Sequence, residues 1–222
     1  LQSRRQVAFV SASGEVAQHT GTACIAEAGD AEAEGVAVQA NMMRNATVWP
    51  AMLAAYQAAN GPFAERLLAA LDAGEQAGGD VRGRQSAALL VVSGSRSEQP
   101  WRERILELRV EDSNDPLGEL RRLVTVHNAY HHMEAAEERE LGGDFDGALA
   151  HYETARGLLQ GNDEAAFWSA ILMADAGRVD EGRAVLRDIA AREPGWADLL
   201  RRLPAAGLLR NGDATVQQLL GS

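Results

Sequence analysis

The sequence predicts an α+β domain followed by an all-α helical module. In the first half, apolar runs typical of strands alternate with apolar stripes at helical spacing, and from Asp115 onward the helical spacing is continuous. Two similar segments in the second half begin at Gly143 and Gly177, an offset of 34 residues, which is the period of tetratricopeptide helix pairs. We therefore expect an α+β domain over residues 1–114 and a tetratricopeptide-like module over residues 115–222.

The first predicted elements are strands. Residues 6–10 have the pattern of a strand, and residues 15–20 have the pattern of its partner across the Ser13-Gly14 turn, which indicates a hairpin. Residues 36–43 form a further apolar run that ends in the amide and thioether side chains of Asn41, Met42 and Met43. We expect this run to be a strand.

Two helices and two more strands complete the predicted first domain. Thr47 offers an N-cap to a helix through Ala59, and Pro62 stands in the first turn of a second helix. Residues 85–92 return as an apolar strand, and residues 105–110 alternate apolar and charged side chains like a half-buried antiparallel strand. This order indicates a layered sheet with the helix pair on one face.

The composition excludes several classes of protein. The net charge is −11 and the basic side chains are all arginine, so the acidic surface disfavours nucleic acid as a partner. No apolar run approaches the roughly 20 residues of a membrane span. Cys24 is the only cysteine, which rules out an internal disulfide and favours a cytoplasmic location. No glycine signature for a dinucleotide or a nucleotide phosphate follows a predicted strand, and we expect no cofactor.

The beginning of the chain suggests partners. The chain begins with Leu1, and a predicted strand already starts at Gln6, so we expect removed upstream sequence, and an upstream fragment of the same protein is one candidate partner. The strand near Gln6 would have an unpaired edge, and a repeat of only two units exposes surface. Both features predict a homo-oligomer.

The region with the most unusual composition is residues 78–92, where glycines, arginines and amides precede an apolar run. Asp80, Arg82 and Arg84 could orient an amine or a substrate carboxylate, because arginine offers a planar two-pronged donor. They could equally form a structural ion pair that braces a glycine-rich loop. Gly83 fits both interpretations, since it permits positive φ or a close backbone approach.

Four strings, in this order, resemble the bacterial domain-of-unknown-function family numbered 1028: AVQANMM, GGDVRGRQSAALLVV, PWRERILELRVEDSNDPLGELRRL and VHNAY. The similarity runs from about Arg5 to Leu123. This family is regarded as similar to the N-terminal nucleophile (Ntn) hydrolases. The resemblance therefore implies stacked antiparallel sheets between helix layers.

The second half resembles the helical module that often follows this family domain and is described as peptidoglycan-binding. The similarity rests on the strings FW at Phe167, AGR at Ala176, REPGW at Arg192 and LPAAGL at Leu203. An acidic tetratricopeptide-like pair could equally bind a peptide or a neighbouring subunit.

The resemblance implies an Ntn-type amidohydrolase that acts on a small-molecule amide or a peptide. In such enzymes a terminal Thr, Ser or Cys attacks the amide carbonyl and its own α-amine removes the proton. Leu1 cannot do this, so we expect the chain alone to lack its nucleophile and to be inactive. The alternative is a non-catalytic binding or scaffold protein whose repeat binds a peptide, a peptidoglycan fragment or a partner subunit.

Under the enzyme interpretation, six residues are candidates for the site. Asn41 and Gln39 could donate hydrogen bonds to a developing oxyanion, or they could tie down the loop that follows their strand. We assign catalytic roles to Asn41, Asp80 and Arg84. We assign substrate binding to Gln39, Arg82 and Gln85.

Two other groups have only weak metal-binding patterns. His127, His131 and Glu134 fall on one helix face, but three ligands on one helix are more typical of the polar edge of an amphipathic helix. The acidic residues Asp30 and Glu32, with Glu34, lack the spacing of a calcium-binding EF-hand loop, and we expect a solvated turn there. We predict no metal site.

Overall fold

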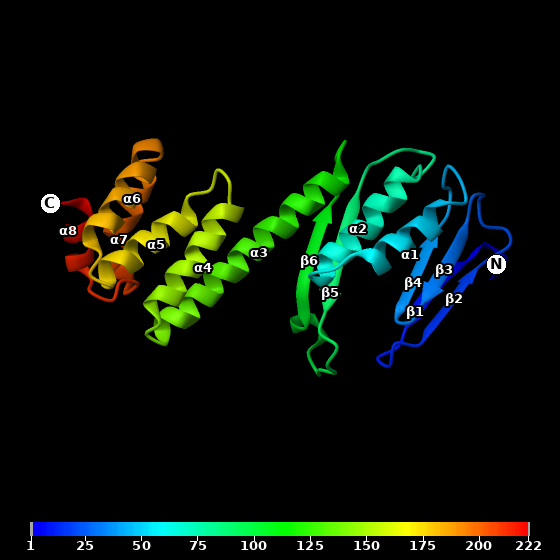
Figure 1. Ribbon diagram of the computed structural model, residues 1–222, viewed down its shortest axis with the longest axis horizontal. Coiled ribbons are helices and arrows are strands. Elements are labelled where there is room, and N and C mark those ends of the chain that lie inside the picture. Colours follow the sequence, from blue (N-terminus) through cyan, green and yellow to red (C-terminus); the bar gives the residue numbers. More distant parts are fainter. Residues whose placement is uncertain (1, 222) are drawn as a thin grey trace. The chain divides into compact units, whose positions relative to one another are not determined.

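The computed structural model describes residues 2–221 (Figure 1). It confirms a mixed α and β region with small antiparallel sheets, followed by a helical module. The chain divides into two compact units after residue 124. Among residues 2–221, no helix combines the length and the apolar composition that a membrane span needs.

The strands of the described residues form three antiparallel sheets of two strands each. The first two sheets are hairpins with tight turns, and the third joins strands on either side of a polar loop. Their bounds are β1 (Gln6–Val10) with β2 (Val16–Thr20), β3 (Gly29–Ala33) with β4 (Val36–Ala40), and β5 (Ala87–Val92) with β6 (Arg104–Val110).

Strand β3 corrects the expectation of a solvated turn. Asp30 and Glu32 alternate with Ala31 and Ala33 along this strand, and the alanines are less exposed than the acids. Alanine is a weak strand former, so the pattern gave little sign of a strand. Pairing with the apolar strand β4 determines the conformation instead.

Two glutamine side chains connect the first two hairpins. The Nε2 amide of Gln39 on β4 donates to the carbonyl oxygens of Val7 (2.8 Å) and His19 (3.3 Å). From β1, the Nε2 of Gln6 donates to the carbonyl oxygens of Gly29 (3.2 Å) and Ala40 (3.0 Å). These amides satisfy backbone acceptors of the neighbouring hairpin and so fix the two hairpins against each other.

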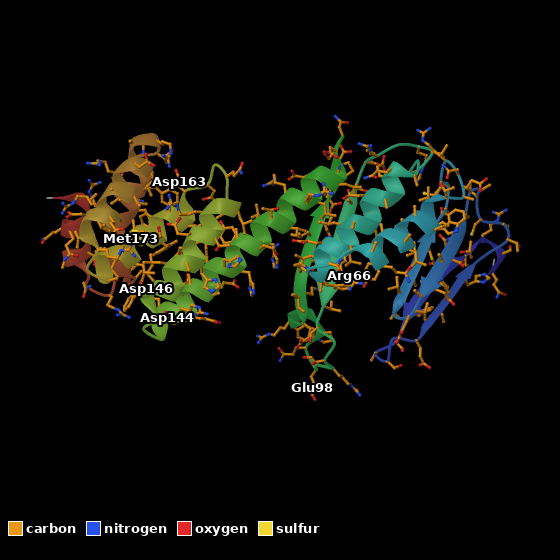
Figure 2. The ribbon with its side chains drawn as sticks, in the orientation of Figure 1. Arg66, Glu98, Asp144, Asp146, Asp163 and Met173 are labelled. Carbon is orange, nitrogen blue, oxygen red and sulfur yellow. The ribbon has the colours of Figure 1, made fainter. Side chains whose placement is uncertain are left out.

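The helix pair of the first unit consists of α1 (Val48–Ala58) and α2 (Phe63–Gln76), which pack on each other. Helix α1 also contacts β3 and β4, and α2 contacts β5, so the pair touches two different sheets. Arg66 of α2, labelled in Figure 2, places its guanidinium 4.2 Å from the centre of the Tyr56 ring of α1. Such a cation–π contact adds to the packing of the two helices.

Thr47 occupies the N-cap position of α1, as the sequence predicts, but its side chain makes no capping bond. The side chain of Asn45 holds the residue before the helix instead, since its Oδ1 accepts the backbone N–H of Thr47 at 2.9 Å. The Nδ2 of Asn45 also donates to the carbonyl of Ala77 at 2.8 Å. Asn45 thereby links the start of α1 to the end of α2.

A third group of apolar side chains sets the boundary between the units. Leu68 of α2, Leu89 of β5 and Leu106 of β6 are buried together with Leu120 and Val124 of helix α3 (Pro116–Leu141). The predicted domain limit at residue 114 coincides with the beginning of this helix. The structure divides the chain ten residues later because the first turns of α3 complete the apolar core of the first unit.

The second unit contains the rest of α3 and five further α-helices among its described residues. Their bounds are α4 (Phe145–Leu158), α5 (Glu164–Asp175), α6 (Val179–Arg192), α7 (Gly195–Arg202) and α8 (Asp213–Leu220). Three short 3-10 helices complete the elements of residues 2–221: Gln2–Arg4, Pro100–Arg102 and Pro204–Ala206.

Helix α5 is the centre of the second unit. Phe167 and Ala170 are fully buried on one side of it, and Ala165 and Leu172 belong to a second buried group that α5 shares with α3 and α4. Its buried Ser169 donates its Oγ hydrogen bond to the carbonyl of Ala166 at 2.8 Å. A helix that is apolar on all sides is expected where two layers of helices cover it.

Candidate functional site

Four of the six predicted site residues lie around one cavity in the first unit. Asp80, Arg82, Arg84 and Gln85 line a cavity of about 530 Å³ between the glycine-rich loop, α1, α2 and the beginning of α3. The loop turns back sharply here because Gly78, Gly79 and Gly83 all have positive φ. Of the two possibilities that the sequence left open for Gly83, the structure shows a positive φ, 98°.

Asp80 and Arg82 form a two-pronged ion pair on the wall of this cavity. The Nε of Arg82 donates to Oδ1 of Asp80 at 2.9 Å, and its Nη2 donates to Oδ2 at 2.6 Å. These hydrogen bonds lower the pKa of the Asp80 carboxyl. The side chain of Arg82 is 66% exposed, so the pair contributes little to stability by itself.

Arg84 is held by a different acid. Its Nε donates to Oε1 of Glu75 on α2 at 2.6 Å, and this hydrogen bond raises the pKa of Arg84. Arg84 and Glu75 also line an adjacent cavity of about 220 Å³, together with Asp115 and Arg121. The guanidinium of Arg84 therefore borders two hollows and is half exposed to solvent.

The remaining surface of the larger cavity is mixed in character. Its apolar lining comes from α1, α2, the segment after β4 and the first turn of α3: Met43, Val48, Met52, Leu71 and Leu117. The charged groups of the loop stand beside this apolar lining. Such a combination suits a molecule that has both an apolar part and a charged or amide group.

The structure does not bring Asn41 or Gln39 to the same cavity. Asn41 donates its Nδ2 hydrogen bond to Oε1 of Gln6 at 2.7 Å and lines a separate hollow with Arg4 and Arg5. Both N–H groups of the Gln39 amide are used, on the carbonyls of Val7 and His19. A donor to an oxyanion needs a free N–H group, so Gln39 would have to break a hydrogen bond between the hairpins first.

The backbone nevertheless connects the two regions. The residue after Asn41, Met42, has φ of 58°, and its carbonyl oxygen accepts the N–H of Val81 at 2.9 Å. Met43 forms an isolated antiparallel bridge with Asp80. The predicted strand therefore ends at Ala40, and its last predicted residues bind the glycine-rich loop instead.

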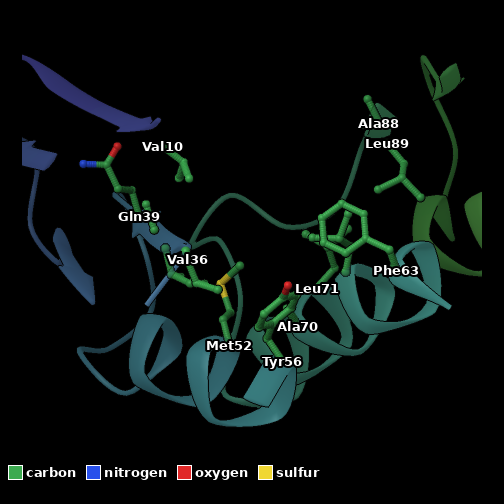
Figure 3. A pocket seen from close by; sticks show the side chains of 14 residues that line it. Val10, Val36, Gln39, Met52, Tyr56, Phe63, Ala70, Leu71, Ala88 and Leu89 are labelled. Atoms are coloured by element: carbon green, nitrogen blue, oxygen red, sulfur yellow. The ribbon is translucent and has the colours of Figure 1, made fainter. Parts of the chain in front are cut away.

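A further cavity of about 430 Å³ is mostly apolar and lies between the hairpins and the helix pair (Figure 3). Met52 and Tyr56 of α1, Phe63 and Leu71 of α2, and Leu89 of β5 line it, and Gln39 stands at its edge. The described side chains around it offer few polar groups. It is suited to apolar contact rather than to chemistry.

The three weakly predicted metal ligands of α3 do not converge. His131 Nδ1 lies 3.6 Å from Oε2 of Glu134, and both side chains are largely exposed. Within residues 2–221, no group of three or more His, Cys, Asp or Glu side chains has a geometry that could hold a metal ion.

A pair that sequence reasoning missed joins α3 to α4. Nδ1 of His132 lies 3.0 Å from Nδ1 of His151, and both rings are partly buried. Burial, followed by the charge of His151, lowers the pKa of His132. Helical spacing within α3 drew attention to His127 and His131, whereas this pair depends on the packing of two helices.

Comparisons with known proteins match two separate stretches of the chain. A family of unknown function, DUF1028, matches residues 1–120, and a tetratricopeptide repeat matches residues 142–203. A crystal structure of a Silicibacter pomeroyi protein, described under the same DUF1028 family, is 31% identical over 55% of this chain and 51% of that protein, with a TM-score of 0.47. The chain thus spans about half the length of that relative. No curated protein matches.

Proposed function

Since this chain belongs to the DUF1028 family of unknown function, we propose that its first unit is the substrate-binding part of an Ntn-type amidohydrolase. The substrate class is a small amide or peptide with an apolar side chain and a carboxylate. One observation carries the proposal: Arg82, Arg84 and Gln85 line the same cavity that also has an apolar lining.

Arg84 is the group that we assign to the substrate carboxylate. It is half exposed and is bound by Glu75 through its Nε. A substrate carboxylate can engage the remaining N–H groups of the guanidinium, or it can replace Glu75, because both are planar acceptors for the same fork. Arg82, which Asp80 already engages with two hydrogen bonds, supports the loop.

The cavity has a binding role in this proposal, and bond cleavage requires a nucleophile from elsewhere. Among the described residues that line it, Ser86 has the only hydroxyl group, and no histidine lines the cavity to act as its base. Activation of a serine requires such a base within hydrogen-bond distance. Ser86 is therefore assigned no catalytic role.

Binding can be tested with two ligands that differ only in the carboxylate, N-acetylleucine and N-acetylleucinamide. We expect N-acetylleucine to shift the amide resonances of residues 78–86, and Arg84→Gln to weaken its binding by about 10- to 100-fold, the value of a hydrogen bond to a charged group. Binding of N-acetylleucinamide should change little.

Arg122→Gln is the matched control, because Arg122 forms a similar exposed pair with Glu119 at 2.7 Å but lines none of these cavities. The proposal fails if neither ligand shifts the loop resonances, or if both arginine variants weaken binding equally. Release of leucine from N-acetylleucine by a full-length family member, reduced by the same Arg84 substitution, would extend the result from binding to hydrolysis.

A second function is favoured by the tetratricopeptide match at residues 142–203. We propose that the helical unit binds a peptide segment of a partner protein. Within this unit, the Tyr130 hydroxyl of α3 donates a hydrogen bond to Oε2 of Glu164 on α5 at 2.6 Å, which links these two helices. Acidic residues outnumber arginines in this unit, so a basic peptide is the expected ligand.

The full chain can be titrated into a fluorescent basic peptide, its acidic counterpart and a labelled muropeptide. We expect the basic peptide to bind and its affinity to fall as salt is added, because salt screens exposed charges. Binding of the muropeptide alone would replace the partner protein by a cell-wall fragment. Absence of binding by all three would contradict a ligand-binding role.

A further inference from the structure

We propose that His132 and His151 form a binding site for a divalent transition-metal ion, which connects α3 and α4 of the helical unit. The proposal is independent of the amidohydrolase function. It rests on the position of two imidazole nitrogens from different helices, Nδ1 of His132 and Nδ1 of His151, which lie 3.0 Å apart.

This separation suits two ligands of one metal ion. Imidazole nitrogens bind such ions at about 2.0–2.1 Å, so two of them lie roughly 2.9 Å apart at a right angle and roughly 3.3 Å apart at a tetrahedral angle. The observed distance lies between these values. Without a metal ion, the same contact requires that one ring donates an N–H group and the other accepts it.

The local sequence explains why the rings meet. Each histidine has an alanine three residues before it and another four residues after it: Ala129 and Ala136 around His132, and Ala148 and Ala155 around His151. All four alanines are fully buried. Small side chains at these positions let two helices approach closely, and the longer imidazoles between them then come into contact.

The environment of the pair suits a metal ion that needs few protein ligands. Both rings are partly buried, which limits their freedom, yet solvent can reach them. Within residues 2–221, no third His, Cys, Asp or Glu joins them in a group that could hold a metal ion, so water would fill the other positions. Cu²⁺ and Ni²⁺ favour nitrogen ligands at right angles and bind nitrogen sites more tightly than Mn²⁺, Fe²⁺ or Co²⁺.

The experiment is a titration of the full chain with NiCl2. Calorimetry measures the binding of Ni²⁺, and thermal unfolding measures the melting temperature of the helical unit. We expect Ni²⁺ to raise this melting temperature, since a ligand that binds only the folded state stabilises it. His132→Ala and His151→Ala should each weaken Ni²⁺ binding by about tenfold or more. His151→Gln keeps a polar side chain of similar size between the helices and tests the same loss should the alanine variant unfold.

A matched control separates this pair from the other histidines of α3. His127 and His131 are four residues apart on one helix and could bind Ni²⁺ by themselves, so the double variant His127→Ala/His131→Ala removes that possibility. We expect the double variant to keep the stabilisation by Ni²⁺. The proposal is overturned if Ni²⁺ does not stabilise the unmodified chain, or if the double variant loses the effect while His151→Ala and His151→Gln keep it.

Discussion

In the loop that borders the cavity, both the backbone conformation of Gly79 and the space around it disfavour a side chain at this position. Its φ is +61°, and a Cβ atom there would lie 2.7 Å from Oε2 of Glu75. We expect Gly79→Ala to lower the free energy of unfolding of the first unit by about 1–2 kcal/mol, the usual cost of a left-handed alanine, plus the cost of displacing Glu75.

Gly83→Ala is the comparison for this prediction, because Gly83 also has positive φ, +98°, but no atom within 4 Å of its added Cβ. Chemical denaturation of both variants measures the difference. If Gly83→Ala is as destabilising as Gly79→Ala, the contact with Glu75 has no energetic weight.

Glu140 on α3 predicts a pH dependence of the second unit. Burial, followed by the charge of Asp175, raises the pKa of this carboxyl. The folded state therefore binds a proton more readily than the unfolded chain, and the charged form lowers stability at neutral pH. The free energy of unfolding of the second unit therefore increases as the pH falls from neutral through the raised pKa of Glu140.

Glu140→Gln should raise the melting temperature at pH 7 and remove this dependence between neutral pH and the ordinary carboxyl range. Circular dichroism at several pH values checks this, with Glu138→Gln as the variant of an exposed acid on the same helix. Parallel melting curves for the two variants would contradict the assignment to Glu140.

At the scale of an element, α4 depends on its cap. Asp144, labelled in Figure 2, is the N-cap residue, and its Oδ1 accepts the backbone N–H of Gly147 at 3.0 Å. Its other oxygen pairs with Arg139 of α3 at 2.5 Å. We expect Asp144→Ala to cost about 1 kcal/mol of unfolding free energy, the typical value of a lost N-cap.

Asp146 provides the control for this cap. It is also an acid at the start of α4, so Asp146→Ala removes a charge near the helix N-terminus but no capping bond. We expect this variant to lose less than half as much, since only the interaction with the helix dipole is weakened. Equal losses in urea denaturation would show that charge, rather than the cap, stabilises α4.

Elements with a strong local pattern could be predicted from the sequence, and those that depend on a partner could not. The hairpin at Ser13-Gly14 and the helix after Thr47 agree with the structure, since turn residues and apolar spacing act locally. Strand β3 escaped notice because it consists of Gly, Ala and acids and needs β4.

The candidate site could likewise be predicted only where its residues are close in sequence. The loop arginines are close in sequence and share one cavity. Asn41 faces Gln6 and a different hollow, because the chain turns at Met42, where φ is positive without a glycine. A strand pattern contains no signal for such a turn. Contacts between helices, such as His132 with His151, are equally absent from a single helical pattern.

At the scale of the whole molecule, each unit has its own core. Leu120 is fully buried among side chains of the first unit, and Leu186 is buried to 2% exposure in the second. Leu120→Ala and Leu186→Ala should each cost about 2–5 kcal/mol, the usual range for buried leucine truncation. Hydrogen exchange should locate the losses in β5 and β6 for Leu120→Ala, and in α5 and α6 for Leu186→Ala.

In each variant, hydrogen exchange of the unit that does not carry the substitution serves as the internal control. We expect its amides to keep the protection seen in the unmodified chain, because local opening follows cooperative units of packed structure. A loss of protection over both units from either substitution would show that they unfold as one.

Because α3 belongs to the cores of both units, its position in the sequence determines when each core can close during synthesis. Leu120 and Val124 leave the ribosome after every strand of the first unit, so the apolar group around β5 and β6 stays open to water until the first turns of α3 have been made. The rest of α3 then emerges before α4, which must cover its apolar side. A nascent chain that has emerged from the ribosome as far as residue 141 would therefore combine a completed first unit with an uncovered helix, and such exposed apolar surface is what chaperones protect.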